Sequence, residues 1–93
     1  MKKKILFLHD TFPAGGAERV TIDIANYITT FGYEVYVGAR VLNVCENKSI
    51  QVIELPDKKT IDSHINIDFL TRTVKELHID IFVLVVLQLV ELF

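Results

Sequence analysis

The stretch from Ile5 to Phe31 constrains the fold most, because an apolar run, a Pro/Gly turn and a helical pattern follow one another there. The first four residues of this stretch are apolar without alternation, which is typical of a strand buried on both faces of a parallel sheet. Gly15 and Gly16 then form a turn that leads into the helix. Such a turn gathers unpaired backbone N–H groups and roughly half a positive charge at one point, which suits a phosphate or another anion.

The helix after this turn is predicted from an amphipathic pattern. Gly16 stands at its expected N-terminus, and Gly32 stands where a left-handed residue commonly ends a helix. Glu18 and Arg19 lie on the polar side. The apolar side, which we expect to pack on the sheet, consists of residues spaced three and four apart: Ala17, Val20, Ile24, Tyr27, Ile28 and Phe31.

Two further strands follow this helix. Residues 34–39 are rich in β-formers and complete a βαβ unit, which is nearly always right-handed with parallel strands. Residues 50–55 form a third strand that stops at Pro56. The connection between these two strands is short, so an antiparallel hairpin competes with a parallel crossover, and we favour the parallel arrangement.

A second helix and a fourth strand complete the pattern. A polar loop at 56–65 precedes the helix, Asp68 lies near its start, and its apolar face consists of Ile67, Leu70, Val74 and Leu77. Residues 81–86 are apolar enough for a strand buried on both faces. Residues 87–93 fit either a continuation of that strand or the start of a third helix.

These elements predict an α/β fold, with a Rossmann-like parallel sheet in the order 3-2-1-4 and flanking helices. Two helices cannot cover both faces of four strands that all read as buried. We therefore expect the uncovered surface to be covered either by the rest of a larger α/β domain or by a tight oligomer of this chain, and we favour the larger domain.

Composition and charge exclude several classes of protein. The net charge is −2, with basic and acidic residues spread along the chain, so no nucleic-acid partner is indicated. Cys45 is the one cysteine, which excludes an internal disulfide and a CxxC motif and fits a reducing compartment, the cytoplasm. Lys2 to Lys4 precede too short an apolar run for a secretory signal.

The apolar C-terminal part, Ile79 to Phe93, raises the question of a membrane. It is shorter than the ~20 residues needed to span a bilayer, and it carries Asp80, Gln88 and Glu91. A buried strand and an interfacial membrane segment are the two interpretations, and the length and charges favour the strand.

The first apolar run and the turn after it hold the candidate site residues. Gly15 and Gly16 either let a ligand phosphate approach the backbone or serve only as turn residues, and their place at the switch point of the sheet favours the phosphate. The fingerprints GxGxxG and GxxxxGK[ST] are absent, which argues against NAD enzymes and P-loop NTPases. Arg19 is either a phosphate contact or a solvated helix residue, and Glu18 is interpreted as a partner of the helix dipole.

His9 and Asp10 follow the first apolar run at the expected cleft. Each is a candidate acid–base or substrate-orienting group, with a strand-end hydrogen bond as the alternative for His9 and an Asx turn as the alternative for Asp10. His64 and His78 lack the spacing of metal ligands and are expected at the surface, so no metal site is predicted. Cys45 is expected to be a small core residue.

Four segments resemble the start of the family 4 glycosyltransferases: Lys4–Leu8, Gly15–Val20, Ala25–Tyr27 and Gly32–Val35. The similarity is clearest over residues 1–39 and looser to about residue 86. The resemblance implies a GT-B fold, in which two Rossmann-like domains face each other across a cleft. It implies retaining transfer of a sugar from a nucleotide-sugar donor to a glycan or lipid-linked acceptor, without a metal or another cofactor.

By this resemblance, residues 1–93 are an incomplete N-terminal, acceptor-side domain. Gly15 and Gly16 then lie beside the donor diphosphate, and His9 and Asp10 are candidate acceptor-side contacts. The family's nucleotide site belongs to a C-terminal domain that would act in cis, so we expect no transfer by residues 1–93 alone. The family also tends to place a catalytic histidine beyond the fourth strand, and residues 87–93 contain none. The alternative is a non-catalytic α/β binding module of the receiver-like or flavodoxin-like kind.

Overall fold

The computed structural model describes residues 2–13, 16–43, 47 and 49–85, and for residues 16–18 it describes the backbone alone. Predictions for Gly15, Cys45 and residues 86–93 lie outside this part. The elements in chain order are β1 (Lys4–Phe12), α1 (Gly16–Ile28), the short 3₁₀ helix η1 (Thr29–Phe31), β2 (Glu34–Leu42), β3 (Ile50–Glu54), α2 (His64–Leu77) and β4 (Ile81–Leu84).

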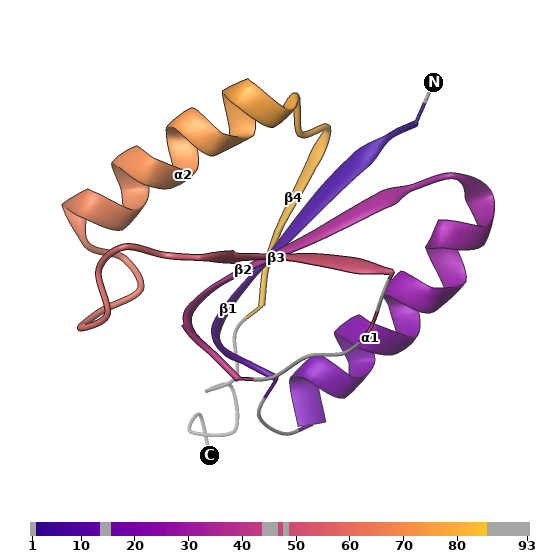
Figure 1. Ribbon diagram of the computed structural model, residues 1–93, viewed down its shortest axis with the longest axis horizontal. Helices are drawn as coiled ribbons and strands as arrows, with labels where there is room; N and C mark the ends of the chain where they lie inside the picture. Colours follow the sequence, from indigo (N-terminus) through magenta and orange to yellow (C-terminus); the bar gives the residue numbers. More distant parts are fainter. Residues whose placement is uncertain (1, 14–15, 44–46, 48, 86–93) are drawn as a thin grey trace, which may run out of the picture.

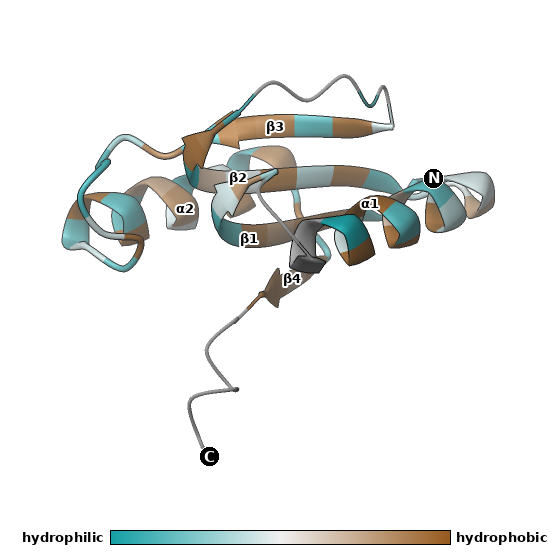
Figure 2. Cartoon of the chain, turned by 90° about the horizontal axis from the view of Figure 1, so that it is seen from below, coloured by the Kyte–Doolittle hydropathy of each residue, from teal (hydrophilic) through white to brown (hydrophobic). Residues whose placement is uncertain are grey.

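The strands form one parallel sheet in the order β3-β2-β1-β4, as predicted, and β3 is parallel to β2. Helix α1 lies on one side of the sheet and α2 on the other (Figure 1). Figure 2 shows the strands one above another in the order β3, β2, β1 and β4. The fold is therefore a Rossmann-like α/β arrangement.

Strand β1 lies at the centre and carries the core on both of its faces. Ile5 and Phe7 belong to the cluster beneath α1, whereas Leu6 and Leu8 belong to the cluster beneath α2. All four side chains are buried, as their unbroken apolar run predicted. Each such burial contributes roughly 1.5–3 kcal/mol, so this strand anchors both layers.

Strand β4 differs from its prediction as a strand buried on both faces. Phe82 is 48% exposed and Leu84 is 59% exposed. In the described part of the chain β4 pairs with β1 and forms an edge of the sheet. Val83 packs against the cluster beneath α1, whereas Phe82 and Leu84 point to the other face and are exposed. An apolar run shows that a strand favours burial, but no described element covers this face of β4.

Helix α1 also packs differently from its prediction. Thr21 and Ala25 are buried against the sheet, and Ile28 of the expected apolar face packs against the same cluster, whereas the other described side chains of that face are exposed. That exposed stripe, roughly a quarter-turn around the helix from Thr21, consists of Val20, Ile24, Tyr27 and Phe31. The face of α1 that meets the sheet is thus centred on Thr21 and Ala25 and flanked by Ile22 and Ile28.

The helix ends follow local chemistry. Gly32 adopts φ 90° directly after η1, and its N–H bonds to the carbonyl of Thr29, as expected of a left-handed terminating residue. Helix α2 begins at His64, earlier than the loop assigned to 56–65 allowed, because Ser63 caps it by accepting a hydrogen bond from the N–H of Asn66. Ile67, expected in its core face, is 51% exposed.

Candidate functional site

The candidate site lies at the carboxyl end of β1. Strand β1 continues to Phe12, so His9 and Asp10 lie within the strand and not in the turn after it. This excludes the Asx turn considered for Asp10. Beyond Phe12 the chain passes through Pro13 and enters α1 at Gly16, the predicted helix start.

Asp10 forms an ion pair with Arg40 of β2. The guanidinium donates two hydrogen bonds to the carboxylate, from Nε to Oδ1 at 2.7 Å and from Nη2 to Oδ2 at 2.8 Å. This pair holds the pKa of Asp10 below its ordinary value, with burial opposing the effect. Asp10 is therefore a carboxylate at neutral pH and is unsuited to donate a proton.

Arg40 also reaches the loop between β3 and α2, where its Nη1 donates to the carbonyl oxygen of Lys58 at 2.6 Å. Asn66 of α2 orders the same loop. Its side-chain amide accepts a hydrogen bond from the N–H of Asp57 and donates one to the carbonyl oxygen of Thr60. Asn66 is fully buried, so these hydrogen bonds compensate its desolvation. The carboxyl ends of β1, β2 and β3 are thus tied together.

His9 faces the opposite helix. Its Nε2 lies 2.8 Å from Oγ1 of Thr21 on α1, and both side chains are 2% exposed. Its ring also contacts Phe12, with ring centroids 5.1 Å apart. Of the two interpretations for His9, a hydrogen bond at the strand end describes the structure, and the bond joins β1 to α1.

Asn43 holds the start of the β1–α1 turn. Its backbone N–H donates to the carbonyl of Phe12 at 2.8 Å, and its side-chain Nδ2 donates to the carbonyl of Pro13 at 2.9 Å. Neither Asn43 nor Arg40 was predicted from the sequence. Their contacts depend on the register of the paired strands, because Lys4 lies beside Glu34 and each later residue of β1 lies beside the residue thirty positions further along the chain.

Arg19 lies on the exposed surface of α1, where its Nε is 3.4 Å from Oδ1 of Asp23 one helical turn later. Glu18 lies in the first turn of the helix by its backbone position. His64 and His78 are exposed, as expected. The structure thus brings His9, Asp10 and the start of α1 to one edge of the sheet, with Arg19 on the outer side of that helix.

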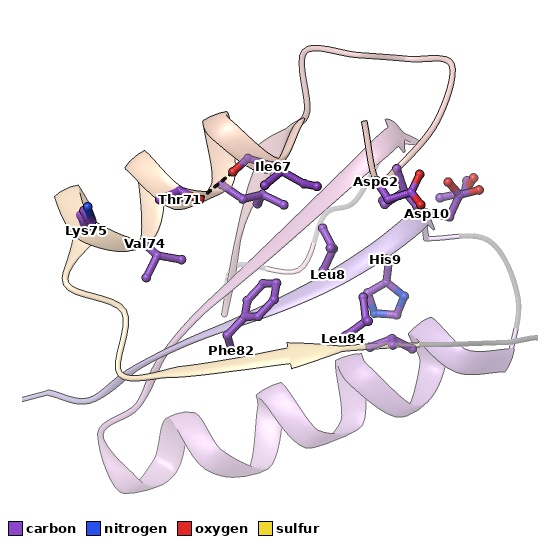
Figure 3. A pocket seen from close by; sticks show the side chains of 14 residues that line it. Leu8, His9, Asp10, Asp62, Ile67, Thr71, Val74, Lys75, Phe82 and Leu84 are labelled. Carbon is purple, nitrogen blue, oxygen red and sulfur yellow. Dashed lines mark hydrogen bonds between the residues drawn. The ribbon is translucent and has the colours of Figure 1, made fainter. Parts of the chain in front are cut away.

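A groove of about 1040 Å³ runs along the α2 side of β1 and β4, as Figure 3 shows. Its walls are largely apolar, and polar residues contribute to its lining. The apolar walls include Leu8, Leu70, Val74, Phe82 and Leu84; the polar residues are His9, Asp10, Thr11, Asp62, Thr71 and Lys75. Exposed apolar surface of this kind is suited to contact with further protein or with an apolar ligand.

Two further features bear on the class of site. No group of three or more His, Cys, Asp or Glu side chains suited to a metal ion occurs among the residues that the structure describes. Within that same part of the chain, neither helix has the length and apolar character needed to cross a bilayer.

Comparison with known proteins supports the fold. No model of a protein family matches the chain, and no curated protein matches it. Among solved structures it is similar to WaaG, described as a glycosyltransferase involved in lipopolysaccharide biosynthesis, with a TM-score of 0.67 and 23% sequence identity. The match covers 86% of this chain and 23% of the WaaG chain. At this identity the similarity establishes the fold, which is shared with part of a glycosyltransferase.

Proposed function

We propose that this chain is the N-terminal, acceptor-side part of a GT-B glycosyltransferase of the family 4 type. The observation that carries the proposal is the position of the β1–α1 turn. The turn follows β1, and in a sheet ordered β3-β2-β1-β4 the carboxyl end of β1 lies at the switch point where ligands of such sheets bind. The similarity to WaaG supports the same class of protein.

In the proposed reaction a sugar passes from a nucleotide-sugar donor to a glycan or lipid-linked acceptor with retention of configuration. The N–H groups at the start of α1, at Gly15 and Gly16, help to neutralise the diphosphate as the glycosidic bond breaks. Arg19 is a further candidate contact for that phosphate. This chemistry is electrostatic and requires no metal from this chain.

Asp10 is the proposed acceptor-side contact. Its side chain is 54% exposed although it is paired with Arg40. A carboxylate offers about four acceptor positions, and the guanidinium occupies two, so Asp10 retains capacity to accept hydrogen bonds from sugar hydroxyls. An ionised, oriented carboxylate is suited to bind and position an acceptor hydroxyl.

The alternative of a receiver-like or flavodoxin-like module does not fit the sheet. In that class the first strand lies between the second and third, in the order 2-1-3. Here β1 lies between β2 and β4. A non-catalytic module of another kind is the competing function that the experiment must exclude.

The experiment uses the intact gene product that contains this chain. It is incubated with a panel of nucleotide sugars and glycan or lipid-linked acceptors, and released nucleoside diphosphate and glycosylated product are measured by mass spectrometry. We expect transfer with retention, read from the anomeric proton by NMR. We also expect the coding sequence after Phe93 to specify a second Rossmann-like domain. A folded gene product that lacks this domain and transfers no sugar would refute the proposal.

A further inference from the structure

The hydrogen-bonded pair of His9 and Thr21 has a place in the site that the sequence did not suggest. We infer that His9, through Thr21, is a positioning residue that fixes the first turns of α1 relative to the carboxyl end of β1. By doing so it sets the affinity for the donor diphosphate at the start of that helix. This inference rests on the proposed function and deepens it.

The first step of the argument is the place of the pair on both sides of the turn. His9 contacts Phe12, the last residue of β1, through its ring, and Thr21 of α1 through Nε2. The turn that carries Gly15 and Gly16 lies between these two contacts in sequence. Figure 1 shows the start of α1 beside the end of β1. One side chain therefore links the element that enters the turn to the element that leaves it.

The second step is the nature of the packing around Thr21. The large apolar side chains of the early helix, Val20 and Ile24, are 57% and 40% exposed and do not lock α1 to the sheet. The positions that face the sheet are the small residues Thr21 and Ala25, flanked by Ile22 and Ile28, which pack against the same core cluster. Apolar contacts of this kind are non-directional, whereas a buried hydrogen bond is directional and costly to break.

The third step is distance along the helix. Gly16 precedes Thr21 by five residues in α1, which corresponds to about 7.5 Å of rise. The helix transmits a displacement at Thr21 to its first N–H groups. The start of the turn is held separately, because Asn43 binds the carbonyl oxygens of Phe12 and Pro13. Loss of the His9–Thr21 bond would therefore release the helix side of the turn while the strand side stays fixed.

The test compares variants of the intact gene product. Thr21→Val is close in shape and removes the hydroxyl, Thr21→Ser keeps the hydroxyl, and His9→Gln replaces the ring with an amide able to bond the same oxygen. Ile50→Val is the matched stability control, because Ile50 is buried in the same core cluster but lies on β3. We expect Thr21→Val to raise KM for the donor about tenfold, equivalent to about 1.4 kcal/mol, with kcat within about twofold. Thr21→Ser and His9→Gln, which each keep a hydrogen bond at this position, should leave KM for the donor close to the wild-type value.

Amide hydrogen exchange on the same proteins gives a readout that does not require activity. Thr21→Val should accelerate exchange at Val20 and Thr21 more than Ile50→Val does at equal loss of stability. A KM and an exchange pattern that match those of Ile50→Val would overturn the inference and leave a purely structural bond. If the wild-type product transfers no sugar, the proposed function fails, and the exchange data alone decide whether His9 positions the helix.

Discussion

The guanidinium of Arg40 and the carboxylate of Asp10 form a bidentate pair across the neighbouring strands β1 and β2. Parallel pairing at a constant offset places the two residues side by side. Arg40 therefore fixes the orientation of Asp10. It also stabilises the ionised carboxylate, because its hydrogen bonds lower the pKa of the carboxyl group. The candidate acceptor contact depends on a residue of a different strand.

Arg40→Gln tests this dependence. The pKa of Asp10 should rise toward its ordinary value, and the protein should be less stable at neutral pH. A lowered pKa stabilises the fold above the pKa of the unfolded carboxyl group, and this contribution is lost as pH falls through the folded value. The difference between wild type and variant should therefore shrink on acidification below about pH 4. NMR titration of Asp10 and urea unfolding measure both effects.

Arg19→Gln is the matched control for this variant, since it removes the same group from the exposed Arg19–Asp23 pair. Exposed pairs contribute at most about 1 kcal/mol, so stability should change little. An Asp10 pKa that is unchanged in Arg40→Gln would contradict the assignment.

The orientation of α1 is tested by two substitutions on different sides of the helix. Ala25 is fully buried against the sheet, so Ala25→Leu should destabilise the protein by about 1–3 kcal/mol through overpacking. Val20 is exposed, so Val20→Ala should change stability by no more than about 0.5 kcal/mol. Urea unfolding measures both. The reverse ranking would restore the face predicted from the sequence.

Gly32→Ala isolates the effect of a backbone conformation. Gly32 has φ 90°, and an added Cβ would meet no atom within 4 Å, so the expected cost is that of the left-handed backbone, about 1–2 kcal/mol. Thermal unfolding should show a lower Tm. Unchanged stability would mean that the end of η1 rearranges without cost.

Gly16→Val tests the proposed diphosphate contact in the intact gene product. A branched side chain at the start of α1 should obstruct the phosphate and abolish turnover while the fold is retained. Gly32→Ala is the opposite control, because it should lower stability and keep turnover at permissive temperature. Unchanged turnover in folded Gly16→Val would remove this glycine from the site.

The sequence alone determined the order and type of the elements and the parallel α/β class. These follow from local signals: the unbroken apolar run at Ile5–Leu8, the helical periodicity after Gly16 and the terminating Gly32. It also placed His9 and Asp10 near the carboxyl edge of the sheet, because they follow the apolar run of a central strand. The start of α2 was missed because the capping role of Ser63 was not recognised.

Only the tertiary structure decided which groups meet. A periodic pattern shows which side chains favour burial, but the way a helix is rotated on the sheet decides which face is buried. Here Thr21 and Ala25 are buried, while Val20 and Ile24 are exposed. The partners of Asp10 and His9 lie on other elements, so their contacts depend on strand register and helix position. No local pattern of residues contains that information, and these contacts define the site.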